Sequence, residues 1–184
     1  METRTITLYG DDGAPVPARE AVPSALARAA VIVLGDGSVV DRVAGAGYHA
    51  VGLELALDVV SDATLLTAVD AALARLLVKP ERIGVVGFGH GARASFLVAA
   101  EKWLGAAVGW SGEGIVAARG AHHPALAGRA YAMQTPWLGL VVDDPGDALA
   151  HALLEAPVDA AVVRPVDEVD AWERTFDWFE RFLL

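Results

Sequence analysis

The sequence contains no cysteine, which excludes disulfide bonds, thiolate metal ligands and a cysteine nucleophile. Basic side chains are also scarce: 14 Lys and Arg stand against 24 Asp and Glu, which gives a net charge of −10. A nucleic-acid-binding protein needs a basic face to displace counterions, and a peripheral membrane protein uses similar charge. We therefore expect neither nucleic acid nor a membrane surface as a partner.

Long apolar runs are missing as well. The longest stretch without Asp, Glu, Lys or Arg covers residues 130–142, well short of the roughly 20 residues that a membrane-spanning helix needs. Residues 1–4 lack the apolar core of a secretion signal. These absences predict a cytoplasmic protein, and the length of 184 residues predicts a single domain over 1–184.

The composition is strongly apolar. Hydrophobic residues make up 54% of the chain, and the 19 glycines bring the total to about 64%, against roughly 45–50% for an average domain on the same tally. Such an excess is typical of strands buried on both faces, as in the parallel sheets of α/β proteins. The high apolar fraction and the short loops are also compatible with a homodimer.

Strands and helices alternate along the chain. Apolar runs that end at turn residues predict strands at residues 5–9, 14–18, 29–34, 49–55, 83–88, 106–110, 137–142 and 159–164, the first two forming an edge hairpin. Helical periodicity predicts helices over residues 39–44, 62–78 with Ser61 as the cap, from near Gly91 to Lys102, and 170–184. This order predicts a doubly wound, mostly parallel sheet flanked by helices.

A glycine-dense turn follows the predicted strand at residues 83–88, where α/β folds bind ligands. Two motifs fit it. In the nucleophile elbow, G-x-S-x-G, Gly87 and Gly91 take the glycine positions and Gly89 takes that of the nucleophile. The dinucleotide fingerprint, G-x-G-x-x-G/A, is matched by Gly87, Gly89 and Ala92, with Glu113 as the acid for a ribose. The second motif keeps a dinucleotide binder open as an alternative.

Five segments in the right order are similar to the dienelactone hydrolase family of the α/β-hydrolase superfamily. They are the strand into the oxyanion loop (30–34), the G-Y-x-A strand entry (45–51), the lead into the elbow (79–88), the strand before the catalytic acid (135–140) and the last helix (172–182). The resemblance covers most of the chain. It implies a minimal α/β-hydrolase fold and, in that family, hydrolysis of small ester or lactone bonds.

The departures from that family bear directly on activity. The family's nucleophile is cysteine or serine, whereas Gly89 has no side chain that could attack a carbonyl. Its triad histidine belongs in the loop at residues 164–170, which contains none. Strict alignment puts the acid position on Pro145, with Asp143, Asp144 and Asp147 nearby. The sequence therefore predicts a catalytically silent protein. A hydrolase with rearranged residues stays open, with His90, Ser111, Asp143 and Asp144 as its weak candidates.

A silent elbow still has backbone donors. A helix that begins near Gly91 leaves its first N–H groups free, and its dipole favours an anion there. We expect a small carbonyl or carboxylate ligand above Gly89, next to the N–H of His90. The residues expected to contact it are Gly35, Asp36, Gly37, Ser38, Gly89, His90 and Gly91. By the same resemblance Asp36 could correspond to the family's cleft acid, but it is more typical of a simple turn residue.

No metal site and no cofactor are expected. The adjacent His122 and His123 could bind a metal only with acidic partners such as Glu113 or Asp143. Adjacent histidines in a loop are more often merely solvated. His49 and His151, on a predicted strand and a helical segment, are expected to be structural.

Overall fold

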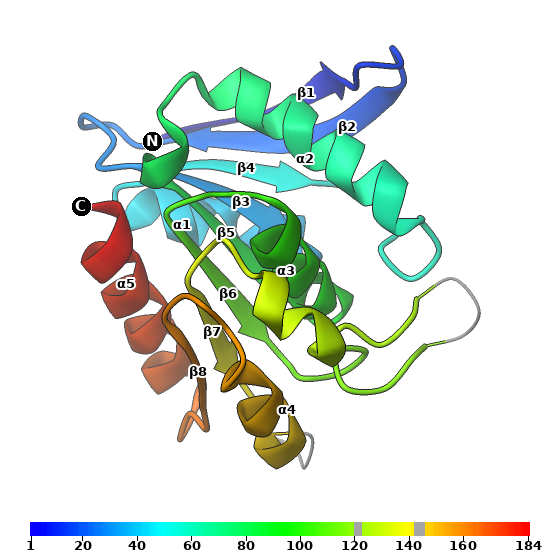
Figure 1. Ribbon diagram of the computed structural model, residues 1–184. Coiled ribbons are helices and arrows are strands. Elements are labelled where there is room, and N and C mark those ends of the chain that lie inside the picture. The colour runs from blue at the N-terminus through cyan, green and yellow to red at the C-terminus, as the bar shows by residue number, and fades with distance from the viewer. Residues whose placement is uncertain (120–122, 142–145) are drawn as a thin grey trace.

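The computed structural model describes residues 1–119, 123–141 and 146–184. Its centre is a single sheet in the order β1-β2-β4-β3-β5-β6-β7-β8 (Figure 1). The strands are β1 Glu2–Tyr9, β2 Pro15–Val22, β3 Ala30–Leu34, β4 His49–Leu53, β5 Ile83–Phe88, β6 Ala106–Trp110, β7 Trp137–Leu140 and β8 Ala160–Val163. Strands β3 to β8 are parallel, while β1 and β2 form an antiparallel hairpin that joins the sheet at β4. The predicted doubly wound, mostly parallel sheet is confirmed.

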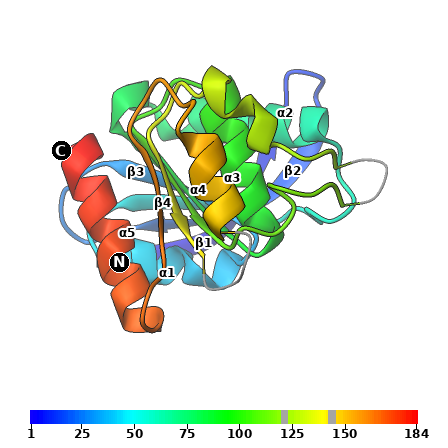
Figure 2. The same ribbon diagram turned by 60° about the horizontal axis from the view of Figure 1, so that its bottom comes forward.

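Helices cover both faces of the sheet, as a second view shows (Figure 2). The helices are α1 Val40–Gly45, α2 Asp62–Leu76, α3 His90–Glu101, α4 Gly146–Leu153 and α5 Glu168–Leu183, with short 3-10 turns η1 Gly37–Val39, η2 Pro80–Arg82 and η3 Ala127–Ala132. Buried side chains of α2, α3 and α4 form one core against the sheet, and those of α1 and α5 form another. Every residue of β3 is buried, as a central strand between two helical layers requires.

The element boundaries follow from pairing and capping. Ser61 caps α2 as predicted, since its Oγ accepts a hydrogen bond from the N–H of Thr64. The helix ends at Leu76, two residues earlier than expected, because Leu77 turns into the left-handed region at φ 51°. The hairpin strands are longer than expected, since β2 has a ladder partner on each side. Strand β4 ends at Leu53, where both of its ladders end.

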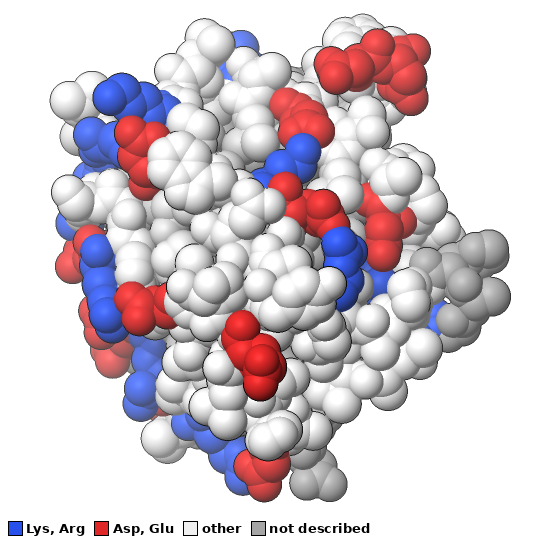
Figure 3. All heavy atoms as spheres, in the orientation of Figure 1, with Lys and Arg blue, Asp and Glu red and all other residues white. Residues whose placement is uncertain are grey.

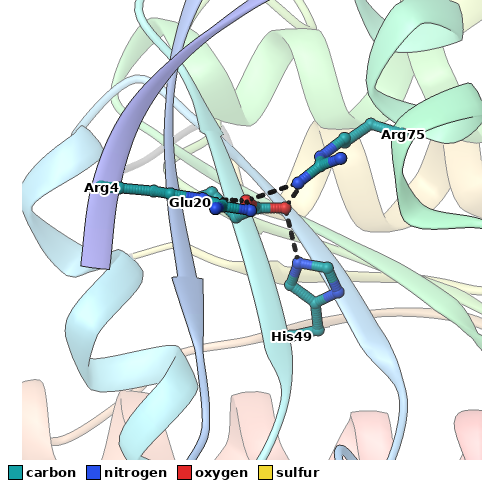
Figure 4. A network of polar contacts seen from close by, with 4 residues as sticks. All are labelled: Arg4, Glu20, His49 and Arg75. Carbon is teal, nitrogen blue, oxygen red and sulfur yellow. Dashed lines mark hydrogen bonds and ion pairs between the residues drawn. The ribbon is translucent and has the colours of Figure 1, made fainter. Parts of the chain in front are cut away.

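A buried carboxylate ties the hairpin to the rest of the sheet. Glu20 on β2 is 1% exposed and accepts hydrogen bonds from Arg4 on β1, Arg75 on α2 and His49 on β4 (Figure 4). Burial alone would raise the pKa of Glu20, but the hydrogen bonds from Arg75, Arg4 and His49 outweigh it and lower the pKa to about 2. The network joins four elements around one charge, and His49 has the structural role that was predicted for it.

The tryptophans divide between core and surface. Trp137 is fully buried in the core, with its Nε1 donating to Ser95 Oγ at 3.1 Å. Trp110, at the end of β6, is half-buried, and its Nε1 donates to Thr175 Oγ1 on α5.

Within the described ranges, no helix combines the length and apolar character that crossing a bilayer would need.

Candidate functional site

The junction of β5 and α3 is a sharp turn centred on Gly89, whose backbone has φ 55° and ψ −116°. Close packing of the backbone requires glycine at the two flanking positions, Gly87 and Gly91. A Cβ on Gly87 would lie 1.8 Å from the carbonyl oxygen of Gly91, and one on Gly91 would lie 2.1 Å from that of Leu34. The strand end and helix start can therefore approach this closely only with glycine at both positions. This is the geometry that the elbow pattern predicts.

Gly89 differs from the flanking Gly87 and Gly91. It is exposed, and a Cβ built on it would meet no other atom within 4 Å. Space therefore does not require glycine here, although the positive φ favours it. Helix α3 begins at His90, one residue before the predicted start, so the N–H groups of His90 and Gly91 lie in a first turn without intrahelical acceptors.

The loop after β3 lies directly against this turn. The backbone nitrogen of Gly35 is 3.3 Å from the Cβ position of Gly91, and a Cβ on Gly35 itself would lie 2.6 Å from the carbonyl oxygen of Phe88. The fold thus brings together the two segments from which the sequence predicts backbone donors.

Asp36 in that loop is a turn residue. Its Oδ1 accepts the N–H of Ser38 at 2.9 Å, and hydrogen bonds from the side chain and backbone of Ser38 lower the pKa of Asp36 below its ordinary value. The N–H of Ser38 is therefore already used within the turn, which removes it from the predicted donors of this loop. Asp36 also contributes a negative charge close to the elbow.

The side chain of His90 takes part in a surface cluster that the sequence does not predict. Arg119, in the segment after β6, donates from Nη1 to His90 Nδ1 at 2.9 Å, and its Nη2 pairs with Glu113 at 3.0 Å. The cluster sets a guanidinium beside the first residue of α3. The carboxylate of Glu113, which the dinucleotide motif would assign to a ribose, is thus paired with Arg119. Dinucleotide binding stays a prediction.

A cavity of about 360 Å³ opens at the same carboxyl edge of the sheet, between the ends of β6, β7 and β8. Its walls are mostly apolar, and its lining is Trp110, Ser111, Gly112, Leu140, Val141, Pro165, Val166, Asp167, Glu168 and Ala171. Ser111, a weak nucleophile candidate, lines this cavity, and its Oγ accepts the N–H of Glu113 at 3.0 Å. None of the residues expected to contact the ligand belongs to this lining.

The remaining candidates lie elsewhere or outside the described residues. Asp143, Asp144 and His122 fall outside the described ranges. His123 is 6% exposed, and its Nε2 bonds to the carbonyl oxygen of Val60 at 2.9 Å, so it packs in the fold rather than lying in solvent as expected. Among residues 1–119, 123–141 and 146–184, no three His, Cys, Asp or Glu side chains gather as metal ligands. His151 lies on α4, where it is exposed rather than packed as a structural residue.

Comparison with solved structures identifies the fold, whereas no family model and no curated protein matches the chain. A protein of Klebsiella pneumoniae assigned as a dienelactone hydrolase superposes with a TM-score of 0.84 at 23% identity, over 98% of this chain and 99% of that one. The esterase domain of a Rhodothermus marinus protein gives 0.72 at 15% identity over 100% of both chains. A Pyrococcus furiosus esterase gives 0.72 at 13%, over 100% of this chain and 93% of its own. The chain has the α/β-hydrolase fold.

Proposed function

We propose that this α/β-hydrolase-fold chain is a dienelactone-hydrolase-like protein that binds a small carboxylate or carbonyl compound at the Gly89 turn without cleaving it. The single observation behind the proposal is the turn itself, which has the sharp elbow backbone and no side chain at its centre. Hydrolysis in this fold needs a nucleophile and a base. Residues 164–170 contain no histidine, and Gly89 offers no nucleophile.

Three features support an oxygen ligand at this position. The N–H groups of His90 and Gly91 open the helix α3, whose dipole adds positive potential there. The loop at Gly35 lies against the same turn, which puts its backbone next to the first turn of α3. The open space above Gly89 lets a ligand oxygen approach the backbone more closely than a serine or cysteine would permit.

Charge near the turn has both signs, which sets the expected affinity. Arg119 beside His90 favours an anion, while ionised Asp36 and the net charge of −10 oppose one. The two effects predict weak binding with a Kd in the millimolar range. A Kd of 1 mM corresponds to a binding free energy of about −4 kcal/mol. Weak, backbone-based binding is typical of an exposed site with few side-chain contacts.

Titration of the ¹⁵N-labelled protein with acetate and benzoate tests the proposal. We expect saturable amide shifts at Gly35, Gly89, His90 and Gly91, and we expect Gly89→Ala to abolish them, because its methyl group fills the open space. Gly128→Ala is the matched control, since that glycine also has open space around it but lies on η3, away from the turn. Absence of shifts at 20 mM ligand, or binding unchanged in Gly89→Ala, would contradict the proposal.

A second candidate function, hydrolysis of small esters or lactones by rearranged residues, is favoured by Ser111. This hydroxyl lines the apolar cavity at the carboxyl edge, where a substrate would have room. Assay of a panel of aryl esters and lactones tests it, with Ser111→Ala as the discriminating variant. Turnover that disappears in Ser111→Ala would establish this alternative, and absence of turnover in the parent protein would remove it.

A further inference from the structure

The largest hollow of those described lies at the opposite edge of the sheet, where the parallel strands begin. It has a volume of about 600 Å³, in the range typical of small-molecule sites. The residues that line it come from the loop before β3, the start of β4 and the segment between α2 and β5: Leu26, Ala27, Arg28, Ala29, Ala30, His49, Leu77, Val78, Lys79, Glu81 and Arg82. Its floor is formed by the buried Ala29 and Ala30 with the half-buried His49.

The rim of the hollow is rich in cations, in a chain with a net charge of −10. Arg28, Lys79 and Arg82 line it, and Figure 3 shows Lys and Arg side chains gathered at the upper left, over the end of α2. Two glutamates offset part of this charge: Arg28 pairs with Glu180 at 2.8 Å, and Lys79 is 3.9 Å from Glu81. The Lys79 side chain remains 81% exposed, so its ammonium is available to a ligand.

His49 connects the floor of the hollow to the Glu20 network. There a single carboxylate is shared by Arg4, Arg75 and His49. Glu20 is therefore fully occupied, and it does not neutralise the rim. Nε2 of His49 bonds to Glu20, and His49 also belongs to the lining of the hollow.

Leu77 on the lip of the hollow is strained and exposed. Its φ of 51° lies in the left-handed region, where glycine is the usual residue at the end of a helix and a bulky side chain is costly. Leu77 is 88% exposed, and Leu26 on the same lip is 96% exposed. Folding gains little from a leucine in this position, and glycine would serve the turn better. Strain of this kind is a reason to look for a functional role.

We propose that this hollow binds an aliphatic carboxylate, with the carboxylate group at Lys79 and Arg82 and the alkyl chain against Leu26, Leu77 and Val78. The cations supply the attraction for the head group, and the apolar lip gains burial that it lacks in the free protein. This site goes beyond the function proposed for the Gly89 turn. It lies at the other edge of the sheet and shares no residue with that turn.

Calorimetric titration with octanoate, octanol and acetate tests whether both parts of the site are used. We expect octanoate to bind at least tenfold more tightly than either octanol, which lacks the charge, or acetate, which lacks the chain. Equal affinity for octanoate and octanol, or no octanoate binding below 10 mM, would overturn the proposal.

Two variants separate binding from stability. Leu77→Gly removes the strain together with the apolar contact, so we expect an unchanged or higher Tm with octanoate binding weakened about tenfold. Lys79→Gln should weaken octanoate about fivefold, whereas Lys102→Gln, the matched loss of a charge bound to Asp70 and outside the lining, should not. Octanoate affinity that survives Leu77→Gly, or that falls equally in both lysine variants, would contradict the site.

Discussion

Three glycines of the β5–α3 turn are present for two different reasons. Gly87 and Gly91 leave no room for a methyl group, since a Cβ on either would overlap a backbone oxygen. Gly89 has ample room, and only its positive φ favours glycine. An active relative of this fold accepts that strain in exchange for a nucleophile. Glycine at this position removes the strain and the nucleophile together.

Gly89→Ser is therefore expected to destabilise the protein by about 1–3 kcal/mol, the typical cost of one strained non-glycine residue. Urea unfolding of both proteins measures the difference. Gly128→Ser is the control, because that glycine has the same free space without a positive φ, and its change should stay within about 0.5 kcal/mol. If Gly89→Ser is as stable as the parent, the turn does not carry the strain of an elbow.

Sequence predicts the turn but not its surroundings. The glycine pattern is local, so the elbow and the start of α3 follow from a few adjacent letters. The contact of Arg119 with His90 spans 29 residues and depends on how the segment after β6 folds back. Likewise, the cavity beside Ser111 forms only where three strand ends meet the start of α5. Neither the Arg119–His90 contact nor this cavity produces a periodicity or a residue spacing that could be read from the sequence.

At the scale of elements, Glu20 links β1, β2, β4 and α2 through one buried charge. A carboxylate 1% exposed is stable as an anion only because three cationic or hydrogen-bonding groups surround it. Loss of that charge should loosen the hairpin from the parallel part of the sheet.

The pH dependence of Glu20→Gln tests this link. The folded pKa of about 2 lies below the ordinary 4.5, so the stabilisation is present above pH 4.5 and is lost as the pH falls toward 2. The shift corresponds to about 3 kcal/mol. We expect urea unfolding to show Glu20→Gln less stable than the parent by about this amount at pH 7, with the gap closing below pH 4.5. Glu81→Gln, at the surface, should differ by less than about 0.5 kcal/mol, and a pH-independent gap for Glu20→Gln would contradict the account.

Periodicity predicts most elements, and its failures have physical causes. The long helices α2 and α5 bury one regular stripe and are found close to where they are expected. Helix α4 is missed as a defined element, because eight residues that begin with glycine give too short a pattern. The lengths of β1 and β2 are underestimated, since ladder partners on both sides of β2 stabilise polar residues that alternation alone does not assign to a strand.

At the scale of the whole molecule, the two edges of the sheet have different characters. The carboxyl edge has the Gly89 turn, the loop at Gly35 and an apolar cavity, with paired charges such as Arg119–Glu113 and Arg42–Glu168 nearby. The amino edge has a cationic rim and exposed leucines over a broad hollow. Gly89 leaves the turn without a nucleophilic side chain, and residues 164–170 contain no histidine, which supports our proposal that the fold is a binding scaffold.

Turnover by Gly89→Cys tests this interpretation most directly. Cysteine is the most forgiving nucleophile to install, because part of it is thiolate near neutral pH and the start of α3 favours the anion. The proposal that no base serves this turn predicts that steady-state hydrolysis of p-nitrophenyl acetate by Gly89→Cys stays within tenfold of the parent protein, even if one equivalent reacts in a burst. Sustained turnover at more than 1 s⁻¹, the lower end of ordinary enzyme rates of about 1–10³ s⁻¹, would show that a base is present and that the site is an enzyme lacking only its nucleophile.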